Sequence, residues 1–182
     1  VDPVSLPPRN RCCVFRGFVD LPSQHVLTHK LDNMSCLMLM NTDARSEKVQ
    51  QAKSGGAEMV WWFPKTSEQY RLRGPLIFVG NGTYEYDNDE FLQKIRTQQW
   101  EKLSDPSRES FLRPVVPGQA VNKDWDVQAG GRDDEGNILP PPDVFLLMIF
   151  KPMNVDYLNL KSLFRQADTF KDGTWTREEL NY

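Results

Sequence analysis

Residues 57–74 read AEMVWWFPKTSEQYRLRG, which has a strand–turn–strand pattern. Its first half is rich in strand-favouring Val and aromatic residues and stops at Pro64, which cannot donate to a sheet ladder. The turn-like KTSE follows, and residues 69–80 (QYRLRGPLIFVG) then alternate polar with apolar side chains before becoming apolar. The two halves therefore predict a β-hairpin.

Short β-prone runs flank this hairpin on both sides. They are residues 11–18 (RCCVFRGF), 35–40 (SCLMLM), 144–152 (VFLLMIFKP), 155–161 (VDYLNLK) and a last piece around 173–180. Strands of this length, separated by turn residues and lacking regular alternation with helices, favour antiparallel pairing over βαβ units. The sequence therefore predicts a mainly β fold with helical inserts, a closed or partly closed antiparallel barrel of six or seven strands.

Two or three helices are expected among these strands. Thr42 or Asp43 can cap a short helix whose end is marked by Gly55 and Gly56. Residues 87–103 have acidic residues in the first turn and an apolar stripe at helical spacing, and a second short helix can begin after Asp105. Residues 113–142 are rich in Pro and Gly, which predicts a long surface loop.

Composition limits the class of protein. The chain has 182 residues, a size that favours a single domain over 1–182. With 22 basic and 25 acidic residues the net charge is −3, so we expect no nucleic-acid partner and no membrane partner. The three cysteines, Cys12, Cys13 and Cys36, form no CxxC pair and only two histidines are present, so no metal site is expected. Reduced cysteines favour a cytoplasmic location.

A basic cluster follows residue 42, where a helix is expected to begin. Arg45, Ser46 and Lys48 offer fixed positive charge and a hydroxyl, and a helix start offers N–H donors, which together suit a phosphate group. A solvated basic helix end is an equally good interpretation of the same residues.

The order of three motifs resembles that of pyridoxamine 5'-phosphate oxidases. The motifs are RCCVFR at 11–16, NTDARSEK at 41–48 and EQYRLRG at 68–74. The last two are most similar to the cyanobacterial-type FMN-binding branch of that family, as are the tryptophan-rich segment at 61–64, WEKLSD at 100–105 and VDYLNL at 155–160. The resemblance covers most of the chain and implies an FMN-binding split barrel.

The resemblance also implies a cofactor, a partner and a set of site residues. The cofactor is FMN, and the partner is a second copy of the chain, because two subunits jointly build each pocket in this family. Arg11 and Lys48 would hold the phosphate, Cys12 to Val14 would lie beside the flavin ring through their backbone, and Gln69 would reach the ring region. The implied flavin contacts are Arg11, Cys12, Cys13, Val14, Asn41, Thr42, Arg45, Ser46, Lys48 and Gln69.

Departures from the oxidase pattern concern the substrate site. Arg16 stands in place of a lysine that binds the substrate phosphate, and Arg165 matches an arginine that meets the substrate. Glu47 occupies the place of a phosphate-binding arginine, although Arg45 supplies a neighbouring charge. Three further family positions hold other residues here, namely Leu158, Ala167 and Thr169.

Two functions follow from this comparison. The first is a flavin-dependent oxidoreductase with a diverged substrate site, for which a phosphorylated B6 vitamer is the candidate small-molecule substrate and no catalytic residue is assigned. The alternative is a non-catalytic homologue with weak or no FMN binding, which acts as a binding or interaction protein.

Overall fold

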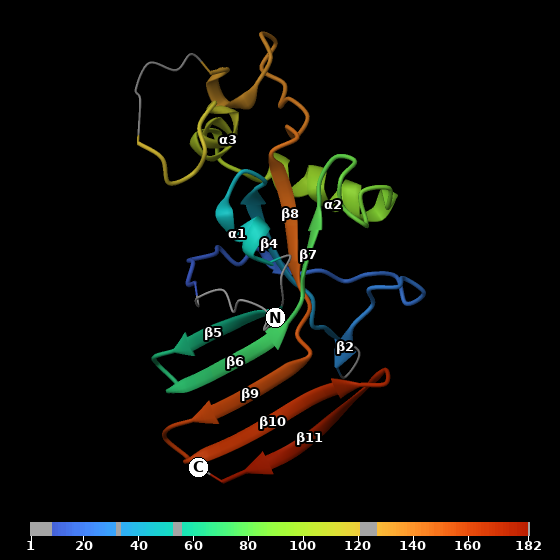
Figure 1. Cartoon of the computed structure of the whole chain (residues 1–182), viewed down its shortest axis with the longest axis vertical. Coiled ribbons are helices and arrows are strands. Elements are labelled where there is room, and N and C mark those ends of the chain that lie inside the picture. The colour runs from blue at the N-terminus through green and yellow to red at the C-terminus, as the bar shows by residue number, and fades with distance from the viewer. Residues whose placement is uncertain (1–8, 32–33, 53–55, 121–126, 182) are drawn as a thin grey trace, which may run out of the picture.

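The computed structural model describes residues 9–31, 34–52, 56–120 and 127–181. Within these residues the chain forms eleven strands, three α-helices and one 3-10 helix (Figure 1). The helices are α1 (Glu47–Ala52), α2 (Glu90–Glu101), α3 (Asp105–Leu112) and the 3-10 helix η1 (Ala129–Gly131). The strands are β1 (Gly17–Phe18), β2 (Lys30–Leu31), β3 (Met34–Ser35), β4 (Met38–Asp43), β5 (Ala57–Phe63), β6 (Glu68–Gly74), β7 (Leu76–Val79), β8 (Phe145–Phe150), β9 (Asn154–Asn159), β10 (Phe164–Lys171) and β11 (Thr174–Leu180).

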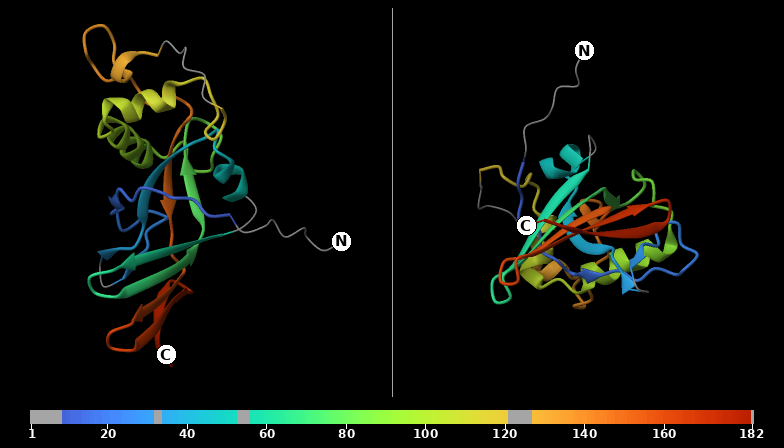
Figure 2. Two further views of the ribbon diagram at one scale, coloured as in Figure 1. Left: turned by 90° about the vertical axis from the view of Figure 1, so that its left-hand side faces the viewer. Right: turned by 90° about the horizontal axis from the view of Figure 1, so that it is seen from below.

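A four-stranded antiparallel sheet with the order β1-β4-β8-β7 contains the most deeply buried strand. Strand β8 reads FLLMIF and is buried at every position, as expected for a strand covered on both faces. Leu147 and Ile149 join an apolar cluster that includes residues of α2, whereas Leu146, Met148 and Phe150 join a second cluster that includes Val49 of α1. Figure 2 accordingly shows α1 and α2 on opposite sides of this sheet.

The second large sheet has five antiparallel strands in the order β11-β10-β9-β6-β5. The predicted hairpin is confirmed, with β5 and β6 in register from Ala57↔Gly74 to Phe63↔Glu68. One face of this sheet packs against the second cluster through residues such as Met59 and Leu72. The opposite face, here called the open sheet face, carries the exposed side chains of Val60 and Trp62. By the register, that face also carries Gln69, Arg71, Arg73, Asn154, Asp156, Leu158, Arg165, Ala167 and Thr169.

The mainly β, antiparallel prediction is confirmed, but the count of six or seven strands is too low. The expected last strand around 173–180 is confirmed as β11, but its hairpin partner β10 was not predicted. The expected strand over 11–18 is wrong for most of its length, since only Gly17 and Phe18 pair with β4, although the Arg16 amide also donates to the Leu39 carbonyl. Cys12 and Cys13 consequently lie outside every sheet of the described chain.

Two or three helices were expected, and three α-helices form in the described residues, the first of which begins later than expected. Thr42 and Asp43 do not cap α1, because they end β4 and pair with β8, so the helix begins four residues after Asp43 at Glu47. Asp89 caps α2 by accepting a hydrogen bond from the Leu92 amide. None of the helices in the described ranges is long and apolar enough to cross a membrane.

The described part of residues 113–142 is only partly exposed. It contains η1, and Gly130 and Gly131 of that turn are buried against α3. An isolated β-bridge between Arg132 and Ile138 closes a tight turn that follows it. The described part of this segment is therefore not only a surface loop, because part of it packs against α3.

The His29 side chain is buried. Its ring lies 4.2 Å from the Phe170 ring and 5.1 Å from the Trp175 ring, measured between centroids. Nε2 donates a hydrogen bond to the Pro152 carbonyl, whereas Nδ1 is buried with no partner among the described residues. Burial lowers the pKa of His29, and the nearby Lys151 charge lowers it further, so the ring is neutral near neutral pH.

We expect the free energy of unfolding to fall on acidification because of His29. Its folded pKa lies below the unfolded value of about 6.5, so the unfolded state binds more protons as pH drops below that value. The stabilisation is full above the unfolded pKa and is lost at up to about 1.4 kcal/mol per pH unit between the two pKa values. Urea unfolding at pH 7 and pH 5 measures this slope, and His29→Gln should flatten it. An equal slope in both proteins would contradict the assignment.

Candidate functional site

A cavity of about 220 Å³ lies where the N-terminal segment, β4, α1 and α3 meet. We call it the cationic pocket. Its lining residues are Cys12, Cys13, Val14, Arg16, Asn41, Lys48, Leu103, Ser107, Ser110 and Phe111. The first six of these were predicted site residues, and they come from three segments that are separated in the sequence. One chain therefore brings five of the ten predicted flavin contacts to one place, together with Arg16, which was predicted to bind the substrate.

The charge of this pocket is purely positive. Arg16 and Lys48 are its charged lining residues, and no Asp or Glu lines it. Lys48 Nζ donates to the Thr42 hydroxyl at 3.1 Å, and neither cation forms an ion pair with the described residues. In a chain with a net charge of −3, two cations without a counter-ion form a local site for an anion.

The Asn41 side chain supplies an independent indication of a ligand. Its Oδ1 and Nδ2 atoms are both buried, and neither has a hydrogen-bond partner in the part of the chain that the structure describes. A buried amide left unsatisfied costs about 1–3 kcal/mol, so such groups are uncommon. Because Asn41 lines the cationic pocket, a ligand group that offers both a donor and an acceptor would complete its hydrogen bonding.

Arg11 lies beside the pocket and is already engaged. Its Nη2 atom pairs with Glu47 Oε2 at 3.2 Å, and its Nη1 atom donates to the Asn10 carbonyl at 2.8 Å. Glu47 follows Ser46 and precedes Lys48 at the start of α1, so the pair brings Arg11 to the same helix end as Lys48. The carboxylate of Glu47 partly neutralises the cation that the resemblance assigns to a phosphate.

Arg45 does not line the pocket. Its guanidinium forms a two-point contact with the Asp43 carboxylate at 3.0 and 2.6 Å and donates to the carbonyls of Phe111 and Arg113. The hydrogen bond to Asp43 raises the pKa of Arg45 above its ordinary value. Arg45 thus ties the end of β4 to the end of α3, and the neighbouring Ser46 is buried.

Gln69 and Arg165 lie on the open sheet face, and neither lines the cationic pocket. Arg165 forms a two-point contact with Asp156 at 3.0 and 2.7 Å, which holds the pKa of that carboxyl below its usual range. Gln69 Oε1 accepts a hydrogen bond from Arg71 Nε at 2.7 Å. A second cavity of about 350 Å³ on this face is lined by Arg71, Arg73, Asn154, Val155, Asp156, Arg165, Ala167, Asp168, Thr169 and Leu180. The two cavities share no lining residue.

The α3 wall of the pocket was missed from the sequence. Ser107, Ser110 and Phe111 are spaced three and four residues apart, so they share one face of that helix. Leu103 completes the wall from the turn that precedes α3. The spacing could have identified this face once the helix was predicted, but nothing in it specified which face meets a ligand. Within the described ranges, no three His, Cys, Asp or Glu side chains gather closely enough to hold a metal ion.

Comparisons with known proteins identify the family to which this chain belongs. The family described as "Pyridoxamine 5'-phosphate oxidase, FMN-binding domain" matches residues 1–80. A crystal structure of a pyridoxamine 5'-phosphate oxidase-related, FMN binding protein from Nostoc punctiforme is 30% identical, with a TM-score of 0.70 over 96% of this chain and 81% of that one. The chain belongs to the pyridoxamine 5'-phosphate oxidase FMN-binding family, and its sheets match the split-barrel architecture.

Two other relatives extend the comparison. Pyridoxine/pyridoxamine 5'-phosphate oxidase 2 of Arabidopsis thaliana is 29% identical over 180 residues, covering 96% of this chain and 80% of its own. PhzG from Burkholderia lata, solved in complex with tetrahydrophenazine-1-carboxylic acid, has a TM-score of 0.57 at 15% identity over 80% of this chain and 68% of that one. At that identity PhzG supports the fold alone.

Proposed function

We propose that this chain binds FMN in the cationic pocket as a homodimer and acts as a flavin-dependent oxidoreductase with a diverged substrate site. The observation that carries the proposal is the pocket itself. Six residues predicted from the family motifs line it, its two cations have no counter-ion among the described residues, and the buried Asn41 amide lacks partners.

The residues present fit an FMN molecule. Lys48, whose ammonium donates a hydrogen bond to the Thr42 hydroxyl, would bind the phosphate, and Arg11 lies at the same helix end. The flavin ring carries adjoining N–H and C=O groups, which match the donor and acceptor that Asn41 leaves unsatisfied. Cys12, Cys13 and Val14 would border the ring with their backbone. Bound FMN would supply the hydride chemistry, and the chain would orient it and exclude water.

A second protomer is needed to complete the site. Ligand pockets typically measure about 300–1,000 Å³, so the 220 Å³ cavity of one chain is too small to enclose a flavin. Gln69 and Arg165, assigned to flavin and substrate by the resemblance, lie on the open sheet face instead. That face exposes Val60 at 62% and Trp62 at 42%, apolar surface that an interface would bury. We infer that the open sheet face of one protomer covers the cationic pocket of its partner.

Placing two carboxylates on the open sheet face tests this arrangement. The double variant Val60→Glu, Trp62→Glu should shift the protein from dimer to monomer and weaken FMN binding by at least about tenfold, because an interface cannot bury unpaired charges cheaply. Light scattering and flavin titration measure the two effects. The matched control is Val26→Glu, Met34→Glu, which charges two other exposed apolar positions. A dimer that survives the first variant and retains FMN would refute the proposed interface.

The substrate site differs from that of a B6-phosphate oxidase. Arg16 lines the cationic pocket and could bind an anionic substrate group, but Arg165 is neutralised by Asp156 and its family companion position holds Ala167. A phosphorylated B6 vitamer is still the candidate substrate, but these differences make the oxidation or reduction of another compound a competing activity. Flavin content after purification tests the cofactor, and turnover of pyridoxine 5'-phosphate with oxygen by the FMN-loaded protein tests the substrate.

One observation favours the non-catalytic alternative. Arg11 is paired with Glu47 and Arg45 is held by Asp43, so two of the cations that the family uses near a phosphate are committed elsewhere. Weak FMN affinity would then leave a split-barrel binding protein. A colourless preparation that fails to quench the fluorescence of added FMN would establish this alternative over the oxidoreductase.

A cytoplasmic location is also part of the proposal. Cys12 and Cys13 are exposed thiols without a disulfide, which suits a reducing compartment.

A further inference from the structure

Two adjacent cysteines line the cationic pocket. Cys12 and Cys13 are both exposed, neither forms a disulfide, and both line the cavity together with Arg16 and Lys48. The segment that carries them lies outside the sheets, so no strand ladder restrains it. The proposed FMN contacts use only the backbone of these residues and leave both sulfur atoms without a role.

We propose that the Cys12–Cys13 pair is a thiol-modification site that reacts with small anionic disulfides of the glutathione class, and that modification and ligand binding in the cationic pocket exclude each other. The modification site stands on the pocket alone. Only the exclusion of FMN rests on the proposed function.

Geometry favours a mixed disulfide over a bond between the two cysteines. Neighbouring Cα atoms across a trans peptide are about 3.8 Å apart, whereas disulfides usually need about 4.4–6.8 Å. A ring formed by Cys12 and Cys13 would be strained and easily reduced. Each thiol of a single chain is therefore left to react with an external partner, which can enter the pocket only where a second protomer does not cover it.

The surroundings of the thiols select an anionic partner. Arg16 and Lys48 line the same cavity without a counter-ion among the described residues, and no acidic side chain lines it. A cleft of one sign of charge raises the local concentration of oppositely charged molecules and their association rate by about 10–10³. The unpartnered Asn41 amide offers hydrogen bonds to a peptide group of the bound molecule. A small disulfide that bears carboxylates and peptide bonds could pair with the Arg16 and Lys48 cations and with the Asn41 amide.

The reaction is a simple exchange. The thiolate of Cys12 or Cys13 attacks one sulfur of the small disulfide, a new protein–glutathione S–S bond forms, and the original S–S bond breaks. The second glutathione leaves as a thiolate with the bonding electron pair. The small disulfide is the only oxidant required. Since the cavity measures about 220 Å³, an attached tripeptide leaves no room for another ligand.

The test compares two disulfides on the flavin-free protein. At low ionic strength, oxidised glutathione should modify Cys12 or Cys13 at least about tenfold faster than neutral hydroxyethyl disulfide, and added salt should narrow the ratio. Peptide mass mapping identifies the modified residue. Arg16→Gln should lower the glutathione rate and leave the neutral rate unchanged. Cys36→Ser is the control, because Cys36 does not line the pocket, and it should react like the parent protein.

Each result separates the two proposals. Equal rates for the two disulfides, or adducts on Cys36 alone, would overturn the modification site whatever FMN does. Thiols that react as expected and are shielded by added FMN support both proposals. If the thiols react as expected but saturating FMN does not slow their reaction, modification and FMN binding do not exclude each other, and the flavin does not bind in the cationic pocket.

Discussion

Replacing Lys48 with alanine is expected to weaken FMN binding by about tenfold to a hundredfold while the protein stays folded. The Lys48 ammonium lines the cationic pocket, and its recorded hydrogen-bond partner is the neutral Thr42 hydroxyl. Its charge is therefore available to a phosphate. Hydrogen bonds to charged groups contribute about 1.5–3 kcal/mol, and each 1.4 kcal/mol is tenfold in affinity. Quenching of flavin fluorescence on titration measures the change.

Lys94→Ala is the matched control, because Lys94 is exposed on α2 and does not line the pocket. Its affinity for FMN should equal that of the parent protein. The salt dependence adds a second readout. In Lys48→Ala the affinity for FMN should fall less steeply with ionic strength than in the parent protein, because one charged contact to the phosphate is lost. If Lys48→Ala binds FMN as tightly as Lys94→Ala, the phosphate does not lie at Lys48.

The elements that the sequence predicted well are those with a strong local pattern. The hairpin of β5 and β6 has strand-favouring residues on both sides of a polar turn, and α2 combines an N-cap aspartate with an apolar stripe. Strand β8 is an uninterrupted apolar run, as expected for a strand that is covered on both faces. In each case the side chains alone determine the backbone.

The errors arose where long-range contacts determine the structure. Strand β10 reads FRQADTFK, a polar pattern with little β-propensity, and it forms because β9 and β11 pair with both its edges. Residues 11–16 have the opposite character, since they favour strands but find almost no partner. Likewise, Thr42 and Asp43 are good N-cap residues that β8 recruits into the sheet.

The candidate site divides in the same way. The structure brings Cys12 to Val14 together with Asn41 and Lys48, because the N-terminal segment meets β4 and α1 at one cavity. The sequence could not show that Arg45 turns toward Asp43 and away from the pocket, since both directions are available to an arginine two residues past a strand. Counting the basic residues in the motifs therefore overestimates the number of cations that can bind a ligand in the pocket.

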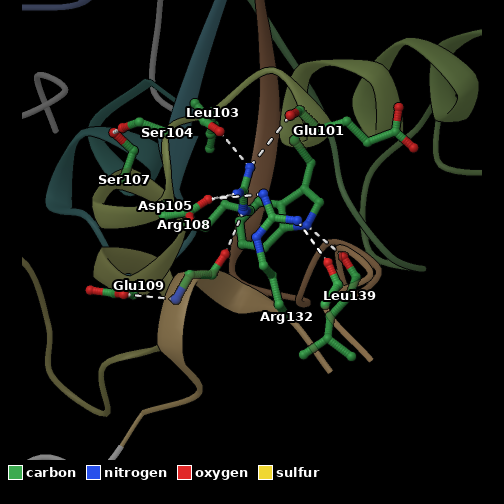
Figure 3. A network of polar contacts seen from close by, with 12 residues as sticks. Glu101, Leu103, Ser104, Asp105, Ser107, Arg108, Glu109, Arg132 and Leu139 are labelled. Carbon is green, nitrogen blue, oxygen red and sulfur yellow. Dashed lines mark hydrogen bonds and ion pairs between the residues drawn. The ribbon is translucent and has the colours of Figure 1, made fainter. Parts of the chain in front are cut away.

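Arg108 supports the α3 wall of the pocket from behind. Its guanidinium is 1% exposed and forms a network that joins α3 to the end of α2 and to η1 (Figure 3). Nε donates to the Gly130 carbonyl at 2.6 Å, and the terminal nitrogens reach the Leu103 carbonyl and the Asp105 carboxylate. Gly131 adopts φ +63°, and a Cβ there would lie 3.1 Å from the Arg108 side chain, so this turn closes directly on the arginine.

Arg108→Leu is therefore expected to lower the free energy of unfolding by about 2–4 kcal/mol, because the substitution strands the buried carbonyls of Gly130 and Leu103 without donors. Arg108→Lys should recover only part of the loss, since an ammonium cannot reproduce the planar guanidinium, which donates hydrogen bonds in three directions.

Arg132→Leu is the matched control. Arg132 pairs with the same Asp105 at 3.2 Å, but its side chain is 36% exposed, so water replaces the lost contact at little cost. Urea midpoints rank the three variants. Similar losses for Arg108→Leu and Arg132→Leu would show that the Asp105 ion pair, and not the carbonyl network, holds the turn against α3.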